Sequence, residues 1–182
     1  MALKATIFKA ELAVSDLDRG HFATHALTIA RHPSETDERM MVRVLAFALN
    51  ADERLAFGRG LSSEGEADLA LTDLTGAIDL WIDVGLPDER DLRKACGRAS
   101  RVAVYAYGTG AATWWKQNAA ALARQSNLAV VELPVESTRA MAALAARTMT
   151  LQCTIQDGHV WLSGAGDPLA IEPVFLQRPA RG

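Results

Sequence analysis

Acidic side chains lie on two apolar segments in the middle of the chain, and a basic helix is expected directly after them. Asp68 begins the short segment Asp68–Leu71, and Asp83 lies near the end of the segment Ala77–Val84. Carboxylates suit Mg²⁺ or Mn²⁺, and a nearby Lys or Arg would neutralise the charge of a phosphate. These residue types predict a site that holds a divalent metal against a phosphate. The alternative is that the same acids are strand-end or solvent-facing residues without a further role.

The segment Ala77–Val84 has the alternation of a β-strand, in which successive side chains point to opposite faces. Its apolar face consists of Ile78, Leu80, Ile82 and Val84. The opposite face consists of Asp79, Trp81 and Asp83. Gly85-Leu86-Pro87 ends the strand, and Asp88 is a good N-cap for a helix that runs to about Ala99.

The helix after Asp88 carries a basic stripe. Arg90, Lys94 and Arg98 are spaced four residues apart, which places them on one face. The formal net charge of −3 argues against wholesale binding of polyanions, although it allows a local basic face. We therefore expect any contact with nucleic acid to use this stripe, while the alternative is a solvated helix face.

A polar segment, Arg31–Arg39, leads into an earlier helix that we expect over Ser34–Asn50, with Ser34 as a cap. Its apolar stripe consists of Met41, Val44, Leu45 and Ala48, and Glu38, Arg39 and Arg43 lie elsewhere on its surface. Glu35 and Asp37 suit the first turn because they complement the positive end of the helix dipole. Glu38 lies a turn further in, where this explanation is weaker.

Both ends of the chain predict β-hairpins. Leu3–Val14 and His21–Ala30 flank a polar turn near the N-terminus. Thr148–Gln156 alternates clearly, and Asp157-Gly158 is a type I′ turn signal that leads into a return strand. A helix is expected over 136–147, and the tail after Ser163 is expected to wrap loosely.

Between these regions, a Gly108-Thr109-Gly110 turn joins the strand Arg101–Tyr107 to a helix expected over 111–125. The turn imitates a dinucleotide-binding fingerprint, with Glu132 at the end of the next strand. The fingerprint needs a third small residue for close packing of the helix on the strand, but Thr113 occupies that position and Trp114-Trp115 follow it. A plain β-α-β crossover is therefore the better account.

Composition predicts one domain spanning residues 1–182, because 49% of the residues are hydrophobic and can form one substantial core. Cys96 and Cys153 are too few for a disulfide framework, which fits a reducing, cytoplasmic location. The N-terminal residues are too interrupted by charge for a secretory signal, and no stretch has the apolar length of a membrane span. The oligomeric state is left open.

From residue 35 onward the expected order is helix, strand, strand, strand, helix, strand. This order resembles the restriction-endonuclease-like core of the PD-(D/E)XK nuclease superfamily. The resemblance implies an α/β fold with a mixed sheet flanked by helices, to which the two hairpins are added. It also implies Mg²⁺ or Mn²⁺ ligands at Asp68 and Asp83, and an accessory acid on the first helix at Glu38.

At a finer level the chain resembles the YaeQ family over nearly its whole length. The segments that carry this resemblance are ARHPSETDERMMVR, LWIDVGLPDE, KACGRA and TMTLQCTIQDG. One departure from the superfamily pattern is serious, since Gly85 occupies the place of the motif lysine after Asp83. That lysine orients the attacking water and stabilises charge in the transition state. Lys94 could supply the ammonium group from the following helix.

Two functions follow as hypotheses. In the first, the protein is a metal-dependent phosphodiesterase of nucleic acid, with Asp68, Asp83 and Glu38 at the metal and Lys94 at the scissile phosphate. In the second, it is a catalytically inactive module on the same fold that binds nucleic acid or protein. A nucleotide-cofactor protein that uses the Gly108 turn is a distant third.

Overall fold

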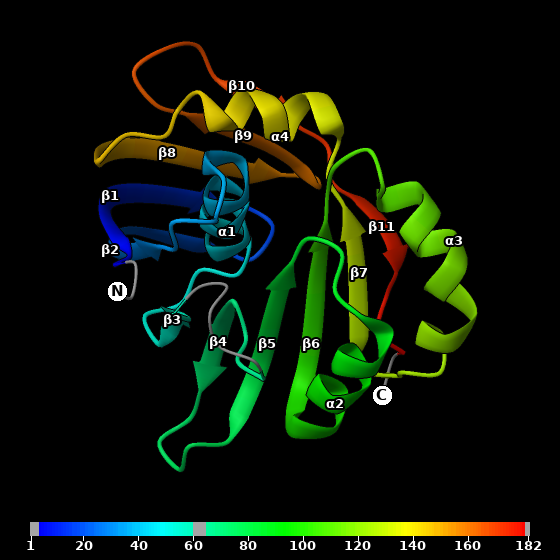
Figure 1. Ribbon diagram of the computed structural model, residues 1–182. Coiled ribbons are helices and arrows are strands. Elements are labelled where there is room, and N and C mark those ends of the chain that lie inside the picture. Colours follow the sequence, from blue (N-terminus) through cyan, green and yellow to red (C-terminus); the bar gives the residue numbers. More distant parts are fainter. Residues whose placement is uncertain (1–3, 60–64, 181–182) are drawn as a thin grey trace.

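The computed structural model describes residues 4–59 and 65–180. Within these ranges the chain forms four helices and eleven strands, arranged as a mixed α/β fold with two mixed sheets (Figure 1). The helices are α1 (Asp37–Leu49), α2 (Glu89–Arg98), α3 (Ala111–Leu122) and α4 (Val135–Ala142). None of the helices in the described ranges has the length and apolarity needed to cross a membrane.

The larger sheet has six strands in the order β11-β7-β6-β5-β4-β3. Their bounds are β3 (Leu55–Phe57), β4 (Leu69–Thr72), β5 (Ile78–Val84), β6 (Ala99–Ala106), β7 (Leu128–Glu132) and β11 (Val174–Gln177). Strands β5, β6 and β7 are parallel and are linked through α2 and α3, as β-α-β units require. The plain crossover predicted around the Gly108 turn is confirmed.

From Leu80 to Val84, strand β5 has the two-faced pattern predicted for it, but the register shifts before Leu80 and Ile78 packs on the Trp81 side, not on the Leu80 side as predicted. Leu80, Ile82 and Val84 are buried in the core that contains α1, whereas Trp81 is buried in a second core with α2 and α3. Asp83 is half-buried on the Trp81 face. The Asp88 cap of α2 is also confirmed, because its side chain accepts a hydrogen bond from the Arg90 backbone N–H.

The smaller sheet has five strands in the order β10-β9-β8-β1-β2. Their bounds are β1 (Thr6–Asp16), β2 (His21–Arg31), β8 (Thr148–Gln156), β9 (His159–Ser163) and β10 (Leu169–Ile171). The expectation of one mixed sheet with two attached hairpins is therefore corrected. The two hairpins exist, but β1 and β8 pair in parallel and join them into a second sheet, which buries the apolar faces of both.

The C-terminal tail is also more ordered than expected. Its two short strands extend both sheets, with β10 against β9 and β11 against β7. The predicted type I′ turn is supported by the positive φ angles of Asp157 (53°) and Gly158 (76°). Asp18 reinforces this turn, because its carboxylate accepts hydrogen bonds from the backbone N–H groups of Asp157 and Gly158.

Helix α1 differs most from its prediction. Its N-cap is Thr36 rather than Ser34, and every residue from Met40 to Ala48 is buried. The helix contacts β1 of one sheet, β5 of the other and α4 (Figure 1). A helix covered on all sides has no polar face, so the expectation of one apolar stripe with Arg39 and Arg43 on the surface is wrong. Helix α4 is shorter than expected, since it ends at Ala142.

Candidate functional site

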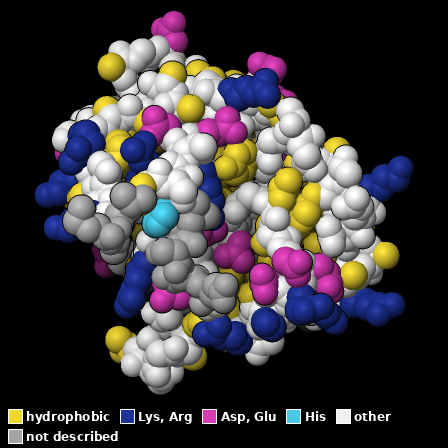
Figure 2. Space-filling model, in the orientation of Figure 1, with side chains coloured by type: hydrophobic (Ala, Val, Ile, Leu, Met, Phe, Trp, Pro, Cys, Tyr) yellow, Lys and Arg dark blue, Asp and Glu magenta, His cyan; other side chains and the backbone are white. Residues whose placement is uncertain are grey.

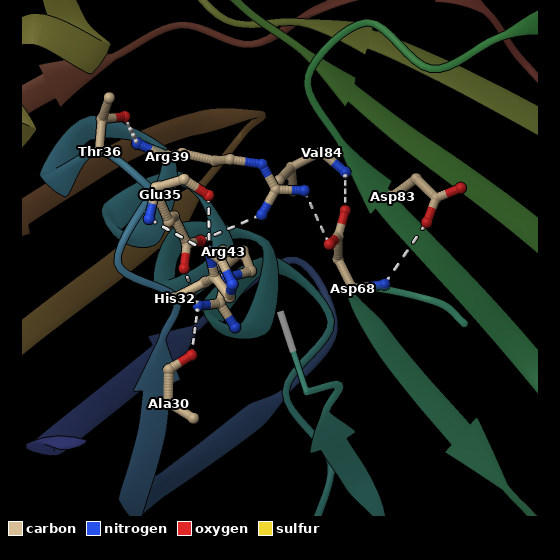
Figure 3. Close-up of polar contacts among 10 residues, drawn as sticks. Ala30, His32, Glu35, Thr36, Arg39, Arg43, Asp68, Asp83 and Val84 are labelled. Atoms are coloured by element: carbon tan, nitrogen blue, oxygen red, sulfur yellow. Dashed lines mark hydrogen bonds and ion pairs between the residues drawn. The ribbon is translucent and has the colours of Figure 1, made fainter. Parts of the chain in front are cut away.

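The two predicted carboxylates lie together at one end of the β4–β5 pair (Figure 3). The antiparallel register joins Leu69 to Ile82, which places Asp68 opposite Asp83 on the same face of the sheet. The Asp68 backbone N–H donates to Asp83 Oδ1 over 3.4 Å. Asp68 immediately precedes β4 and Asp83 lies in β5, so the two acids expected at a shared metal come from neighbouring parts of the sheet.

Asp68 is fixed by its side chain and by its backbone. Its Oδ2 accepts a hydrogen bond from the Val84 backbone N–H (2.8 Å), and its Oδ1 accepts one from Arg39 Nη2 (2.8 Å). The Gly58 N–H donates to the Asp68 carbonyl (2.8 Å). Gly58 must be glycine for this approach, because a Cβ atom there would lie 2.2 Å from the Ala67 carbonyl oxygen. The Asp68 carboxylate is therefore held in one orientation.

Asp83 carries an uncompensated charge. Burial, followed by the negative charge of Asp68, raises the pKa of Asp83 from 3.8 to about 6, and Arg39 opposes this rise only weakly. The Trp81 indole N–H faces Asp83 and also opposes the rise, although Nε1 is buried and makes no hydrogen bond of normal geometry within the described residues. A cation placed beside Asp83 would offset the electrostatic cost of ionising this carboxylate.

The raised pKa of Asp83 predicts a specific dependence of stability on pH. Without metal, the folded protein keeps the Asp83 proton between about pH 4 and pH 6, where the unfolded chain has lost it, so this group lowers stability as the pH rises. Asp83→Asn removes the effect and keeps an acceptor for the Asp68 N–H. We therefore compare the free energies of unfolding of Asp83→Asn and the wild type. The difference, variant minus wild type, is expected to increase by on the order of 2 kcal/mol from about pH 4 to pH 7. Denaturant titrations of both proteins in chelator measure this, and a constant difference would contradict it.

An ion network connects Asp68 to the interior of the molecule (Figure 3). Arg39 bridges Asp68 and Glu35, with Nη1 at 3.0 Å from Glu35 Oε1. Arg43 donates to both oxygens of Glu35 (2.7 Å each) and to the Ala30 carbonyl in β2. The side chains of Glu35 and Arg43 are completely buried. Burial alone would lower the pKa of Arg39, but Asp68 and Glu35 outweigh it and raise that pKa, so Arg39 stays charged.

A pocket of about 1070 Å³ opens in front of the two aspartates. The acids and bases that line it are Glu66, Asp68, Asp83, Asp88 and Asp91, and Arg39, Lys94 and Arg98. Figure 2 shows acidic and basic side chains gathered over α2 at this position. Lys94 is exposed and makes no ion pair with any described residue, whereas Arg98 donates to the Gly65 carbonyl and lies over the Trp81 ring.

Not every predicted residue reaches this pocket. Arg90 is exposed but does not line it, so only Lys94 and Arg98 of the predicted basic stripe do. Glu38 is half-buried on α1 and makes no hydrogen bond or ion pair with either aspartate, whereas the adjacent Arg39 pairs with Asp68. Across the described residues, no three His, Cys, Asp or Glu side chains gather as a metal site. A metal here would have two protein carboxylates, Asp68 and Asp83.

The missing motif lysine has a backbone explanation. Gly85 has a φ angle of +98°, which side-chain-bearing residues rarely adopt, although a Cβ atom there would meet nothing within 4 Å. The sharp bend after β5 thus excludes lysine through conformation and not through lack of space. Lys94 and Arg98 are the two cations of α2 that line this pocket, and Lys94 is the one nearer in sequence to the lost position.

Glu35 and Arg39 are the site residues that sequence reasoning missed. The sequence pattern predicts a helix-capping acid at Glu35 and a surface residue at Arg39. Their signal was present in the spacing, because Arg39 and Arg43 are four residues apart on one side of the helix and Glu35 stands four residues before Arg39, just ahead of the Thr36 cap. What the spacing does not provide is the position of Asp68, which contacts Arg39 from a distant part of the chain.

Comparisons with known proteins agree over nearly the full chain. The model of the family described as "YaeQ protein" matches residues 1–173. The chain is 52% identical to the "Uncharacterized protein YaeQ" of Salmonella typhi and 50% identical to that of Escherichia coli (strain K12), in each case over 99% of this chain and 100% of the relative.

Two crystal structures are also similar. The YaeQ protein from Xanthomonas axonopodis pv. citri superposes with a TM-score of 0.93 at 52% identity, covering 96% of this chain and 99% of that one. The YaeQ protein from Pseudomonas syringae superposes with a TM-score of 0.92 at 34% identity, covering 96% and 97%. The mixed α/β fold with two sheets is thus common to all three chains.

Proposed function

The chain belongs to the YaeQ family, and from that starting point we propose that it binds a divalent cation between Asp68 and Asp83 and hydrolyses phosphodiester bonds of nucleic acid. The names of the relatives given above state no activity. The proposal therefore depends on the geometry of the pocket, together with the resemblance of the sequence to the PD-(D/E)XK superfamily.

The observation that carries the proposal is the pairing of Asp68 and Asp83 on one face, at the wall of a pocket that also contains Lys94. Mg²⁺ sites that act on phosphates commonly use one or two carboxylates and complete the coordination with water and phosphate oxygens. A two-carboxylate site fits this pattern. The uncompensated charge of Asp83 also fits, because a cation is the partner that it lacks.

Each residue has a separate part in the proposed reaction. Asp68 and Asp83 hold the cation, and Val84 and Gly58 fix the orientation of Asp68. When bound, the metal would polarise the phosphate and lower the pKa of a coordinated water. Lys94 binds the phosphate and stabilises the negative charge that develops on it. We give Glu38 no part, since Arg39 takes its expected place beside Asp68.

The charges of the pocket support a requirement for metal. Its lining has five carboxylates and three basic groups, so a nucleic-acid phosphate meets a surplus of negative charge in the absence of a cation. A divalent ion would reverse that balance locally. Lys94 and Arg98 lie at the helix that forms one wall, where they can contact phosphates on either side of the cleaved bond.

The test combines metal binding with cleavage. Asp83→Asn is expected to abolish Mn²⁺ binding in isothermal titration and, with it, Mn²⁺-dependent cleavage of single- and double-stranded DNA and RNA. The matched control is Asp79→Asn, which removes the same charge from β5 outside the pocket, where Asp79 pairs weakly with Arg54 (3.7 Å). This control is expected to retain both properties.

Equal activity of the wild type and Asp83→Asn would show that a contaminant cleaves the substrate. The second candidate function is a catalytically inactive binding module, which is favoured by the commitment of both Asp68 oxygens to Arg39 and Val84. Nucleic-acid binding that is independent of Mn²⁺, combined with no Mn²⁺ binding and no cleavage, would establish this alternative and refute the nuclease proposal.

A further inference from the structure

We propose that Arg39 is a built-in cation that competes with the divalent metal for Asp68 and so sets the metal concentration at which the site fills. This inference rests on the proposed function, because it concerns the regulation of the same site. It assigns to Arg39 a role different from that of a ligand or a purely structural residue.

The contacts place Arg39 where a metal would bind. Its Nη2 lies 2.8 Å from Asp68 Oδ1, and its side chain is only 14% exposed. Arg39 and Asp68 both line the pocket, so their contact lies at a wall that solvent ions can reach. Asp68 Oδ2 is engaged by the Val84 N–H, so Arg39 takes the remaining oxygen of this carboxylate.

A second anchor keeps Arg39 at the pocket wall. Glu35 Oε1 accepts hydrogen bonds from both Arg39 (3.0 Å) and Arg43 Nε (2.7 Å), whereas Oε2 accepts one from Arg43 Nη2 (2.7 Å). Glu35 thus retains Arg39 even when the contact with Asp68 is broken. Because Glu35 holds Arg39 beside Asp68, Arg39 competes with the metal for Asp68 at an effective concentration that is fixed by the fold.

The balance of charge explains why the competition matters. Two carboxylates, Glu35 and Asp68, are matched by two guanidinium groups, Arg39 and Arg43. The cluster is therefore neutral without any metal, and Asp83 provides the only surplus negative charge among these five residues. A divalent cation would enter beside a fixed positive charge, and Coulomb repulsion at such short range weakens its binding.

Removing the charge of Arg39 is therefore expected to strengthen metal binding. Arg39→Gln should lower the Kd for Mn²⁺ by about tenfold or more, since one unit charge a few ångströms away is removed. Arg39→Lys keeps the charge and is expected to remain within about threefold of the wild type. The control Arg93→Gln makes the same change in net charge at an exposed pair with Glu89 and should change the Kd by less than about twofold.

The experiment is isothermal titration of the full chain with Mn²⁺ near neutral pH, using the wild type and the three variants. A second readout is thermal unfolding with and without Mn²⁺, in which Arg39→Gln should gain more in Tm than the wild type, because tighter binding stabilises the folded state more. This second measurement also shows that the variant is folded.

The outcomes separate the two proposals. Mn²⁺ binding by the wild type that is unchanged or weaker in Arg39→Gln would overturn the competition and leave the metal site intact. Binding by Arg39→Gln alone would be the strongest support. Absence of binding in all four proteins would overturn both the competition and the proposed function.

Discussion

Replacing Glu35 with glutamine is expected to lower the free energy of unfolding by about 3–5 kcal/mol. Glu35 is the only carboxylate in contact with Arg43 among the described residues, and it also pairs with Arg39. The side chain of Arg43 is completely buried, and its Nη1 has no hydrogen-bond partner within the described chain. The substitution preserves size and removes the charge, so it leaves a buried cation without its counterion.

Equilibrium unfolding in urea measures this loss, and the slope of the transition shows whether the unfolded state has changed. The control is Glu89→Gln, which removes a partly exposed i,i+4 pair with Arg93 (2.8 Å). Such a pair contributes about 0–1 kcal/mol. A loss for Glu35→Gln no larger than that of the control would show that the buried pair does not hold α1 in place.

Lys94→Ala is expected to reduce the rate of Mn²⁺-dependent cleavage by about 10²–10³ while leaving Mn²⁺ affinity nearly unchanged. The physical reason is that Lys94 lines the pocket without pairing with any described acid, so its ammonium group is available to a phosphate. A residue that stabilises charge only in the transition state affects the rate far more than ground-state binding.

Single-turnover cleavage and Mn²⁺ titration should therefore respond differently to this substitution. The control is Arg90→Ala, one helical turn earlier on α2, where the side chain is exposed and outside the pocket. If Arg90→Ala and Lys94→Ala lost activity equally, the effect would arise from the general charge of the helix. Loss of metal binding in Lys94→Ala would instead assign the lysine to the architecture of the site.

Local patterns predicted much of the fold. The alternation in Ala77–Val84 and Thr148–Gln156 identified β5 and β8, and the Asp88 cap identified the start of α2. These signals are local because the period of a strand and the chemistry of a cap involve only neighbouring residues. The second sheet escaped prediction because the pairing of β1 with β8 joins segments that share no local signal.

The site shows the same division. Asp68 and Asp83 could be paired from sequence because β4 and β5 are consecutive strands joined by a short turn. Arg39 could not be placed, because polarity predicts an exposed surface for a helix that in fact lies between two sheets. The position of α1 follows from the second sheet, so the error in the fold caused the error in the site.

The parallel pairing of β1 with β8 also sets the order in which the chain can complete its native structure. Lys9 pairs with Thr148, so the smaller sheet cannot close until almost the whole chain has left the ribosome. Strands β3 to β7 lie within residues 55–132 and need no later segment to pair with one another. During synthesis, the edge of β1 that pairs with β8 therefore stays open until β8 has been made. Pairing at such long range is slow and exposes apolar surface to other chains, so the N-terminal hairpin is the part of this protein that most needs protection before β8 arrives.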